Sequence, residues 1–272
     1  MAKPAPDPLE ALVSDILKSP KYNHVCEELV QHIGADELGK RRNLKEAVKA
    51  AKNKLHQVGG AFLDGGAAEW GEALAEAARS GDLPAACEQI MNHHASTRER
   101  LPILEEFYTA LFADLPPVRS VLDVACGLNP LAIPWMPLAP GAVYYAYDIY
   151  RDMIDLLNMF WPLVGVQGQA AARDMSRFIP PERVDVALVL KTIPCLEQLD
   201  KTAGLRLIET INAAFLVVSF PVRSLGGYDK GMAENYETRL HTLLEGKNWP
   251  VKRFEFATEL AFVISKPEVE VS

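Results

Sequence analysis

The sequence predicts an α/β fold with a mostly parallel sheet, a helical N-terminal region and an antiparallel C-terminal hairpin. Apolar residues recur at helical spacing up to about residue 115, and runs rich in Val, Ile and Tyr alternate with helical segments after Pro117. Near the C-terminus, FEFATELAFVIS holds two apolar runs separated by a short polar turn. Strands that alternate with helices are typical of parallel sheets, and the final pair of runs indicates a hairpin. We therefore expect a helical domain over residues 1–115 and an α/β domain over residues 116–272.

The helical region contains a strongly amphipathic segment. Its apolar side chains recur at helical spacing and form one stripe, made by Leu44, Val48, Ala51, Leu55 and Val58. Further helices are expected over AAEWGEALAEAARSGD, which Gly81 would cap, and from near Leu83. In HASTRERLPILEEFYTALFADLPP, a helix would begin at Ser96 or Thr97 as N-cap, with Glu99 completing a capping box, and the Pro-Pro pair would end the segment.

In the second half we expect four strands, over residues 121–125, 143–149, 184–190 and 215–220. Helices are expected after Arg151 and after Lys201. This alternation places the ends of several parallel strands at one edge of the sheet, where open α/β folds bind their ligands.

Composition excludes several classes of protein. No apolar run approaches the roughly 20 residues that a membrane span needs, and the N-terminus lacks the features of a secretory signal, so we expect a cytoplasmic protein. The four cysteines show no CxxC spacing, which favours free thiols over a zinc site or a disulfide framework: Cys26, Cys87, Cys126 and Cys195. We expect no bound metal.

The charge is unevenly distributed. The formal net charge of -8 argues against a generally basic nucleic-acid-binding protein. However, KRRNLKEAVKAAKNKLH, from Lys40 to His56, holds seven Lys or Arg residues and one acid. Such a stretch is either a solvated helix face or a local surface for RNA phosphates.

A possible cofactor loop follows the first expected strand, in VLDVACGLNP. A dinucleotide-binding loop uses further glycines so that a pyrophosphate can approach the backbone, and these are absent after Gly127. A NAD dehydrogenase is therefore disfavoured, whereas S-adenosylmethionine, which has no phosphate, remains possible. A plain structural turn is the alternative. Asn129 could contact the cofactor or RNA, or only shape the turn.

Two acids strengthen the case for a cofactor. Asp148 ends the next expected strand, 21 residues after Gly127, where an acid can accept hydrogen bonds from ribose hydroxyls. Asp174 lies where a later strand-to-helix loop is expected and could accept from the adenine amine. Taken alone, Asp148 could instead be a helix N-cap.

The sequence resembles the aminoglycoside-resistance methyltransferases that modify N7 of guanine 1405 in 16S rRNA. The matching stretches run over almost the whole chain: KSPKYNHV, KLHQVGGAF, HASTRERLPILEEFY, DVACGLNPLAIPW, LVLKTIPCLE, VVSFPVRSLGG, KGMAENY and ELAFVIS. The resemblance implies a class I S-adenosylmethionine-dependent methyltransferase fold, Rossmann-like, behind an N-terminal rRNA-binding domain. It also implies action on helix 44 of the assembled 30S subunit, resistance to kanamycin- and gentamicin-type drugs, and no obligate protein partner.

The resemblance further implies roles for single residues. Arg100 would face the methionine carboxylate, Asp148 the ribose, and Asp174 with Met175 the adenine. The complete set of expected cofactor contacts is Phe62, His94, Ala95, Ser96, Arg100, Ala125, Gly127, Asp148, Ile149, Asp174, Met175, Leu190 and Gln198. The expected RNA contacts are Lys21, Lys45, Lys49, Lys52, Lys54, Arg223 and Lys230.

No general base is expected, because N7 of guanine already carries an in-plane lone pair and no proton. Catalysis would then consist of positioning. Two alternatives stay open. One is a small-molecule methyltransferase with a helical lid, and the other is an RNA-binding module that has lost its cofactor.

Overall fold

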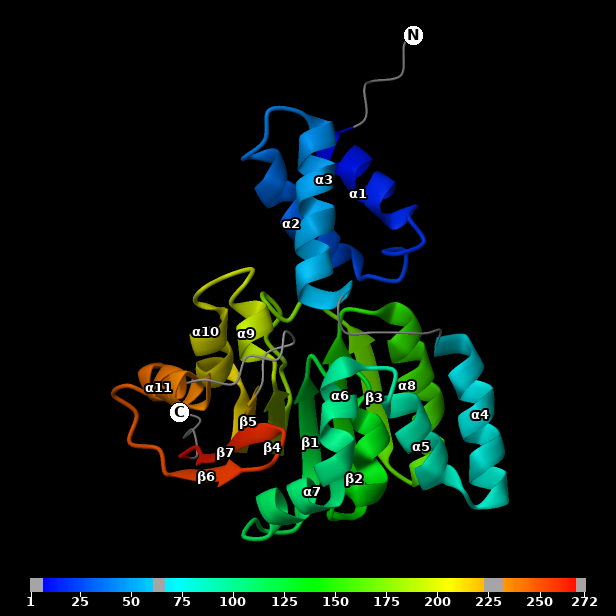
Figure 1. Cartoon of the computed structure of the whole chain (residues 1–272), viewed down its shortest axis with the longest axis vertical. Coiled ribbons are helices and arrows are strands. Elements are labelled where there is room, and N and C mark those ends of the chain that lie inside the picture. The colour runs from blue at the N-terminus through cyan, green and yellow to red at the C-terminus, as the bar shows by residue number, and fades with distance from the viewer. Residues whose placement is uncertain (1–6, 61–66, 223–231, 268–272) are drawn as a thin grey trace.

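The computed structural model describes residues 7–60, 67–222 and 232–267. Helices near the N-terminus form a lobe at one end of the long axis, beside an α/β body whose sheet is covered by helices (Figure 1). Within the described ranges, no helix is both long and apolar enough to cross a membrane.

The N-terminal lobe consists of α1 (Pro8–Leu17), α2 (Glu27–Leu38) and α3 (Leu44–Leu55), followed by the short π-helix η1 (His56–Gly60). Its core is made by one apolar face of each helix. On α3, the side chains of Ala47, Val48, Ala51 and Leu55 are buried, which confirms most of the predicted stripe. Leu44, at the first turn, is 40% exposed instead.

Four helices precede the sheet: α4 (Ala67–Ser80), α5 (Leu83–Met91), α6 (Ala95–Arg100) and, after the turn η2 (Leu101–Ile103), α7 (Leu104–Phe112). Gly81 follows α4 with φ +85°, which suits the expected C-cap. Buried side chains of α4, α5 and α7 share one hydrophobic cluster with β1, β2 and α8. The helices between residues 67 and 112 therefore pack against the sheet, although they belong to the expected helical domain over residues 1–115.

Within the part of the chain that the structure describes, the sheet has seven strands in the order β3-β2-β1-β4-β5-β7-β6. Their bounds are β1 (Val118–Val124), β2 (Leu138–Asp148), β3 (Gln167–Ala172), β4 (Arg183–Leu190), β5 (Asn212–Pro221), β6 (Val251–Glu255) and β7 (Glu259–Ser265). β1 to β5 are parallel, and β7 runs antiparallel between β5 and β6. The four predicted strands and the terminal hairpin are thus confirmed.

Strand β3 was not predicted. Its sequence QGQAAA lacks the β-branched and aromatic residues that favour strands. The strand forms at the sheet edge, where it pairs with β2 over its whole length. At Gly168 the Trp161 ring lies so close that an added Cβ would come within 2.1 Å of it. Tertiary packing therefore outweighs the weak local preference of this segment.

Helices cover both faces of the sheet. Besides α4, α5 and α7, the described helices include the 3-10 helix η3 (Asn129–Trp135), α8 (Arg151–Val164), α9 (Ile193–Leu196), α10 (Ala203–Thr210) and α11 (Met232–Leu243). Figure 1 shows α4, α5 and α8 together on one side and α10 and α11 on the other. The helices predicted after Arg151 and after Lys201 are confirmed as α8 and α10. Neighbouring side chains of β1 belong to different hydrophobic clusters, because successive residues of a strand point to opposite faces of the sheet. Val121 packs in the first cluster and Leu122 in the second.

The N-terminal lobe is attached at the carboxyl end of β2. The backbone N–H of Cys26 donates to the carbonyl of Ile149 at 2.7 Å, and that of Arg151 donates to the carbonyl of His24 at 2.7 Å. Val25 and Tyr150 form an isolated antiparallel bridge. The lobe is therefore joined to the body immediately after Asp148.

Candidate functional site

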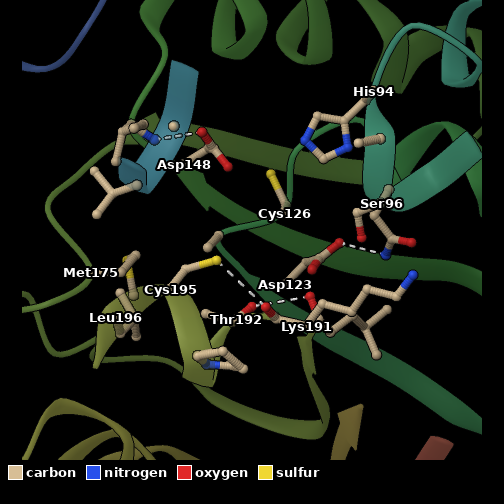
Figure 2. Close-up of a pocket in the computed structure, with 18 of the residues that line it drawn as sticks. His94, Ser96, Asp123, Cys126, Asp148, Met175, Lys191, Thr192, Cys195 and Leu196 are labelled. Carbon is tan, nitrogen blue, oxygen red and sulfur yellow. Dashed lines mark hydrogen bonds between the residues drawn. The ribbon is translucent and has the colours of Figure 1, made fainter. Parts of the chain in front are cut away.

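A cavity of about 300 Å³ lies at the carboxyl ends of β1, β2 and β4 (Figure 2). Its wall also includes Leu29, Val58 and Gly59 of the N-terminal lobe. Eleven of the thirteen residues expected to contact a cofactor line it: His94, Ala95, Ser96, Arg100, Ala125, Asp148, Ile149, Asp174, Met175, Leu190 and Gln198. Gly127 lies beside the cavity and is not among its lining residues, and Phe62 lies outside the described residues.

The backbone is strained where two strands end at this cavity. Ala125, after β1, has φ 51°, and Lys191, after β4, has φ 57°. Residues with a Cβ rarely adopt the left-handed region, and such conformations persist where the surrounding structure enforces them. Both residues line the cavity, so the strain coincides with the candidate site.

Gly127 is needed for close packing against His94. Its φ is +52°, and a Cβ added there would lie 2.6 Å from the Cε1 atom of the His94 ring. Burial and the nearby cations Arg100 and Lys191 lower the pKa of His94 to about 4, so this imidazole is neutral at pH 7. The close approach that the sequence attributed to a cofactor is made in this structure by a side chain.

Asp148 is held by the glycine loop. Its Oδ2 accepts from the backbone N–H of Gly127 at 2.9 Å, and its Oδ1 accepts from that of Ile149 at 2.6 Å. Burial raises the pKa of Asp148, and the backbone hydrogen bonds partly offset this effect. The N-cap of α8 is Tyr150, so Asp148 does not take that alternative role.

Asp174 lies on the loop after β3 and is also buried. Its Oδ1 accepts from the backbone N–H and the hydroxyl of Ser176, and its Oδ2 lies 2.7 Å from Nδ1 of His32 on α2. Burial raises the pKa of this carboxyl, but the hydrogen bonds from His32 and Ser176 outweigh burial and leave the pKa below its usual value. Asp174 therefore stays ionised at neutral pH.

Arg100 is the cation of a buried network. Its Nε and Nη2 donate to the two carboxylate oxygens of Glu259 at 3.0 and 2.7 Å, and its Nη1 donates to Oδ1 of Asn129 at 2.7 Å. The Nδ2 of Asn129 donates to Oδ2 of Asp123, which also accepts from the hydroxyl of Tyr144. Asn129 thus belongs to a hydrogen-bond network at the cavity wall and does more than shape the turn.

Lys191 brings a second cation to the same wall. Its Nζ lies 2.7 Å from Oε2 of Glu99 and 3.4 Å from Oε2 of Glu259. The expected capping box is therefore wrong: α6 begins at Ala95 with His94 as N-cap, and Glu99 pairs with Lys191. The N-cap of α6 therefore lies two or three residues earlier than the Ser/Thr pattern indicated.

Several lining residues are not among those expected from the sequence, including Asp123, Lys191, Thr192, Cys195, Leu196 and Tyr236. Figure 2 shows Asp123, Lys191, Thr192 and Cys195 around the same space as Asp148 and His94. Asp123 and Lys191 could have been found, because each is polar and lies at or just beyond the end of a predicted strand. All four cysteines are free. No group of three described His, Cys, Asp or Glu side chains is placed to hold a metal ion.

The donor set of the cavity suits S-adenosylmethionine. Carboxylates at Asp148 and Asp174 can accept from hydroxyl and amino groups of an adenosine, and Met175, Leu190 and Leu196 offer apolar surface to its base. Arg100 and Lys191 place positive charge where an amino-acid carboxylate could be held. The site therefore combines the three kinds of contact that this cofactor requires.

The expected RNA-binding lysines differ in their surroundings. Nζ of Lys52 lies 3.7 Å from Asp15, and Nζ of Lys54 lies 4.0 Å from Glu37. Lys21 is exposed, and its Nζ lies 3.2 Å from Nδ1 of His56. Lys45 and Lys49 are exposed on α3, with no described carboxylate within 4.0 Å of either ammonium group. Arg223 and Lys230 lie outside the described residues.

Relatives of the chain share its length and fold. A protein named 16S rRNA (guanine(1405)-N(7))-methyltransferase from Micromonospora rosea is 36% identical over 267 residues, covering 96% of this chain and 97% of the relative. One of the same name from Serratia marcescens is 35% identical over 257 residues, covering 94% and 98%.

Solved structures agree with this relationship. The 16S rRNA methyltransferase RmtF, in complex with S-adenosyl-L-homocysteine, superposes with a TM-score of 0.84 at 32% identity and covers 97% of this chain and 100% of that chain. The 16S rRNA methylase RmtB gives 0.81 at 29% identity, covering 97% and 100%. The class I methyltransferase fold expected from the sequence is thereby confirmed. The family profile described as "Ribosomal RNA methyltransferase (FmrO)" matches residues 18–263, and this chain belongs to that family.

Proposed function

We propose that this protein transfers a methyl group from S-adenosylmethionine to N7 of guanine 1405 in 16S rRNA. The main support for the proposal is that three of the motifs that resemble the methyltransferase family line the same cavity. His94 to Arg100 come from HASTRER, Asp123 to Asn129 from DVACGLNP, and Leu190 to Cys195 from LKTIPC. The relatives that bear this activity in their names match nearly the whole chain.

The cofactor is held by residues from different strand ends. Asp148 accepts from the ribose hydroxyls, while Asp174 and Met175 contact the adenine. Arg100 binds the methionine carboxylate with the two of its five N–H groups that Glu259 and Asn129 do not already engage. Lys191 adds positive charge beside it, and Ser96 and Gln198 complete the walls.

The bound cofactor supplies a methyl group activated by its attachment to a sulfonium. N7 of guanine needs no deprotonation, so the protein contributes geometry rather than a general base. Burial raises the pKa of Cys195 to about 11, so this cavity-lining thiol is protonated at neutral pH, and methyl transfer to N7 needs no nucleophilic thiol. The neutral His94 ring adds no charge to the wall that it forms.

The N-terminal lobe binds the RNA substrate within the assembled 30S subunit. We place this reaction in the cytoplasm. N7 faces the deep, narrow major groove of A-form RNA, so the target base leaves its stack to reach the cavity. Lys45 and Lys49 contact phosphates, since no described acid competes for their ammonium groups. A helical lobe adjoining the cavity is suited to hold the surrounding RNA while one base enters.

The test is a methylation assay on purified 30S subunits with cofactor. Reduction and aniline cleavage at 7-methylguanine, followed by primer extension, are expected to give one strong stop at guanine 1405. Protein-free 16S rRNA and free guanosine serve as parallel substrates. A stop with 30S subunits but not with protein-free 16S rRNA, together with no methyl transfer to free guanosine, supports recognition of the assembled subunit.

Cells that express the protein are expected to resist kanamycin- and gentamicin-type drugs, because N7 methylation adds bulk and positive charge where a polycationic drug docks. Unrelated antibiotics should act normally. Methylation of guanosine or another free metabolite, with unmodified 30S subunits, would contradict the proposal and favour the small-molecule alternative.

A further inference from the structure

The N-terminal lobe reaches the cofactor cavity through a buried contact between His32 and Asp174. Nδ1 of His32, on α2, lies 2.7 Å from Oδ2 of Asp174, on the loop after β3. Their side chains are only 9% and 6% exposed. A contact between two polar groups that is this short and this well shielded from solvent strongly constrains both side chains.

Asp174 separates two hollows in the surface. One is the cofactor cavity, and the other is bounded by α2 and by the segment after Asp174. His32 lines the second hollow and not the first. It can therefore act on a cofactor through Asp174 rather than by touching it.

The two carboxylate oxygens of Asp174 accept hydrogen bonds from different partners. Oδ1 accepts from both the backbone N–H of Ser176, at 3.0 Å, and its hydroxyl, at 2.5 Å. Oδ2 has His32 as its close partner. Because a carboxylate oxygen has two lone-pair directions, Oδ1 is filled and Oδ2 keeps one direction for another donor.

We propose that His32 is a positioning residue that fixes the Asp174 carboxylate so that Oδ2 is presented to the adenine amine of the cofactor. The proposal rests on the function proposed above, in which Asp174 accepts from adenine. Ser176 alone anchors one oxygen and leaves the carboxylate free to tilt or to be hydrated at the other. His32 removes that freedom before the cofactor arrives, which lowers the entropy lost on binding.

Substitutions at His32 test this role. His32→Leu removes the donor, whereas in His32→Asn the amide nitrogen can take the place of Nδ1. His24→Leu is the matched control, because His24 also faces an aspartate, Asp152 at 3.8 Å, but is half-exposed and outside the cavity. Affinity for S-adenosylhomocysteine is measured by calorimetry, and thermal melting is followed in parallel.

We expect His32→Leu to weaken S-adenosylhomocysteine about tenfold, as for loss of a hydrogen bond to a charged group. KM for the cofactor should rise similarly while kcat at saturating cofactor stays within about twofold, because no reacting atom is touched. His32→Asn should restore most of the affinity, and His24→Leu should bind like the wild type.

A second ligand separates positioning from a general structural defect. S-inosylhomocysteine carries an oxo group in place of the adenine amine, so wild-type protein should bind it more weakly than S-adenosylhomocysteine. In His32→Leu the ratio of the two affinities should fall toward one, whereas a folding defect would weaken the binding of both ligands equally.

Three results would overturn the proposal: unchanged affinity in His32→Leu, equal loss of both ligands, or a wild type that does not discriminate between them. If His32→Leu does not fold, the proposal is overturned when His32→Asn fails to bind S-adenosylhomocysteine more tightly than S-inosylhomocysteine. Failure of wild-type protein to bind S-adenosylhomocysteine at all would instead contradict the proposed function.

Discussion

Arg100 and Glu259 face each other as a two-point ion pair although 159 residues separate them. The guanidinium is 1% exposed and the carboxylate is fully buried. Burial raises the pKa of Glu259, but Arg100 and Lys191 outweigh burial and hold the pKa below its usual value. The pair joins α6, which carries the HASTRER motif, to β7 of the terminal hairpin. The hairpin therefore holds Arg100 in place at the wall of the cavity.

Glu259→Gln should be strongly destabilising, because it leaves Arg100 buried without a counter-charge. We expect the free energy of unfolding to fall by about 3–5 kcal/mol in urea titrations. Asp114→Asn is the control, since it breaks an exposed pair with Lys252 on the hairpin and should cost less than about 1 kcal/mol. Equal stability of the two variants would show that the buried pair does not hold the hairpin to α6.

Asp148→Asn should weaken cofactor binding while leaving the fold intact. The amide oxygen can still accept from the glycine loop, but the negative charge that we propose for binding the ribose is lost. We expect S-adenosylhomocysteine affinity to fall at least tenfold by calorimetry, in line with loss of charged hydrogen bonds. Asp152→Asn, four residues further and outside the cavity, should bind normally. Tight binding by Asp148→Asn would remove Asp148 from the cofactor site.

Gly127→Ala should disturb both stability and the cofactor site, because the new methyl group would collide with the His94 ring. Gly165→Ala is the matched control: Gly165 also has a positive φ, 68°, but its added Cβ meets nothing within 4 Å. We expect Gly165→Ala to cost about 1 kcal/mol from backbone strain alone. Gly127→Ala should cost more and lower cofactor affinity. Matching effects in the two variants would mean that the His94 contact is unimportant.

Asp123 should make stability depend on pH. Burial raises its pKa in the folded protein to about 7, against hydrogen bonds from Asn129 and Tyr144 that lower it. The unfolded chain ionises near pH 4, so the contribution of this group is full below that pH and is lost as the pH rises toward 7. Relative to the wild type, the always-neutral Asp123→Asn should therefore gain stability between pH 4 and pH 7. Urea titrations across this range measure the difference, and parallel stability curves would contradict the expectation.

Reversing the charge of both Lys45 and Lys49 to Glu should reduce binding to 30S subunits at least tenfold. The salt dependence of binding should fall by about two counterions, because two phosphate contacts are lost. The control reverses Arg119 and Arg183, exposed residues at the amino ends of β1 and β4, away from the cavity. Unchanged subunit affinity in the Lys45/Lys49 variant would leave α3 as a solvated helix face.

Local patterns predicted much of this molecule. The stripe of α3 and the alternating runs of β1, β2, β4 and β5 depend on residues close together in sequence, and so does the terminal hairpin. The exceptions are segments whose local residue types do not favour the structure that they adopt. Strand β3 carries no strand-forming residues, and at α6 the backbone starts the helix after His94 although Ser96 and Thr97 are better capping types.

The sequence by itself determined the main alternation of helices and strands, the family, and the residue types at the strand ends, because spacing and turn chemistry act over a few residues. Only the tertiary structure decided which charges meet. Arg100 reaches Glu259 because β7 inserts beside β5, and His32 reaches Asp174 because the N-terminal lobe docks after β2. These partners are 159 and 142 residues apart, and no local pattern distinguishes them from the other charged residues of the chain.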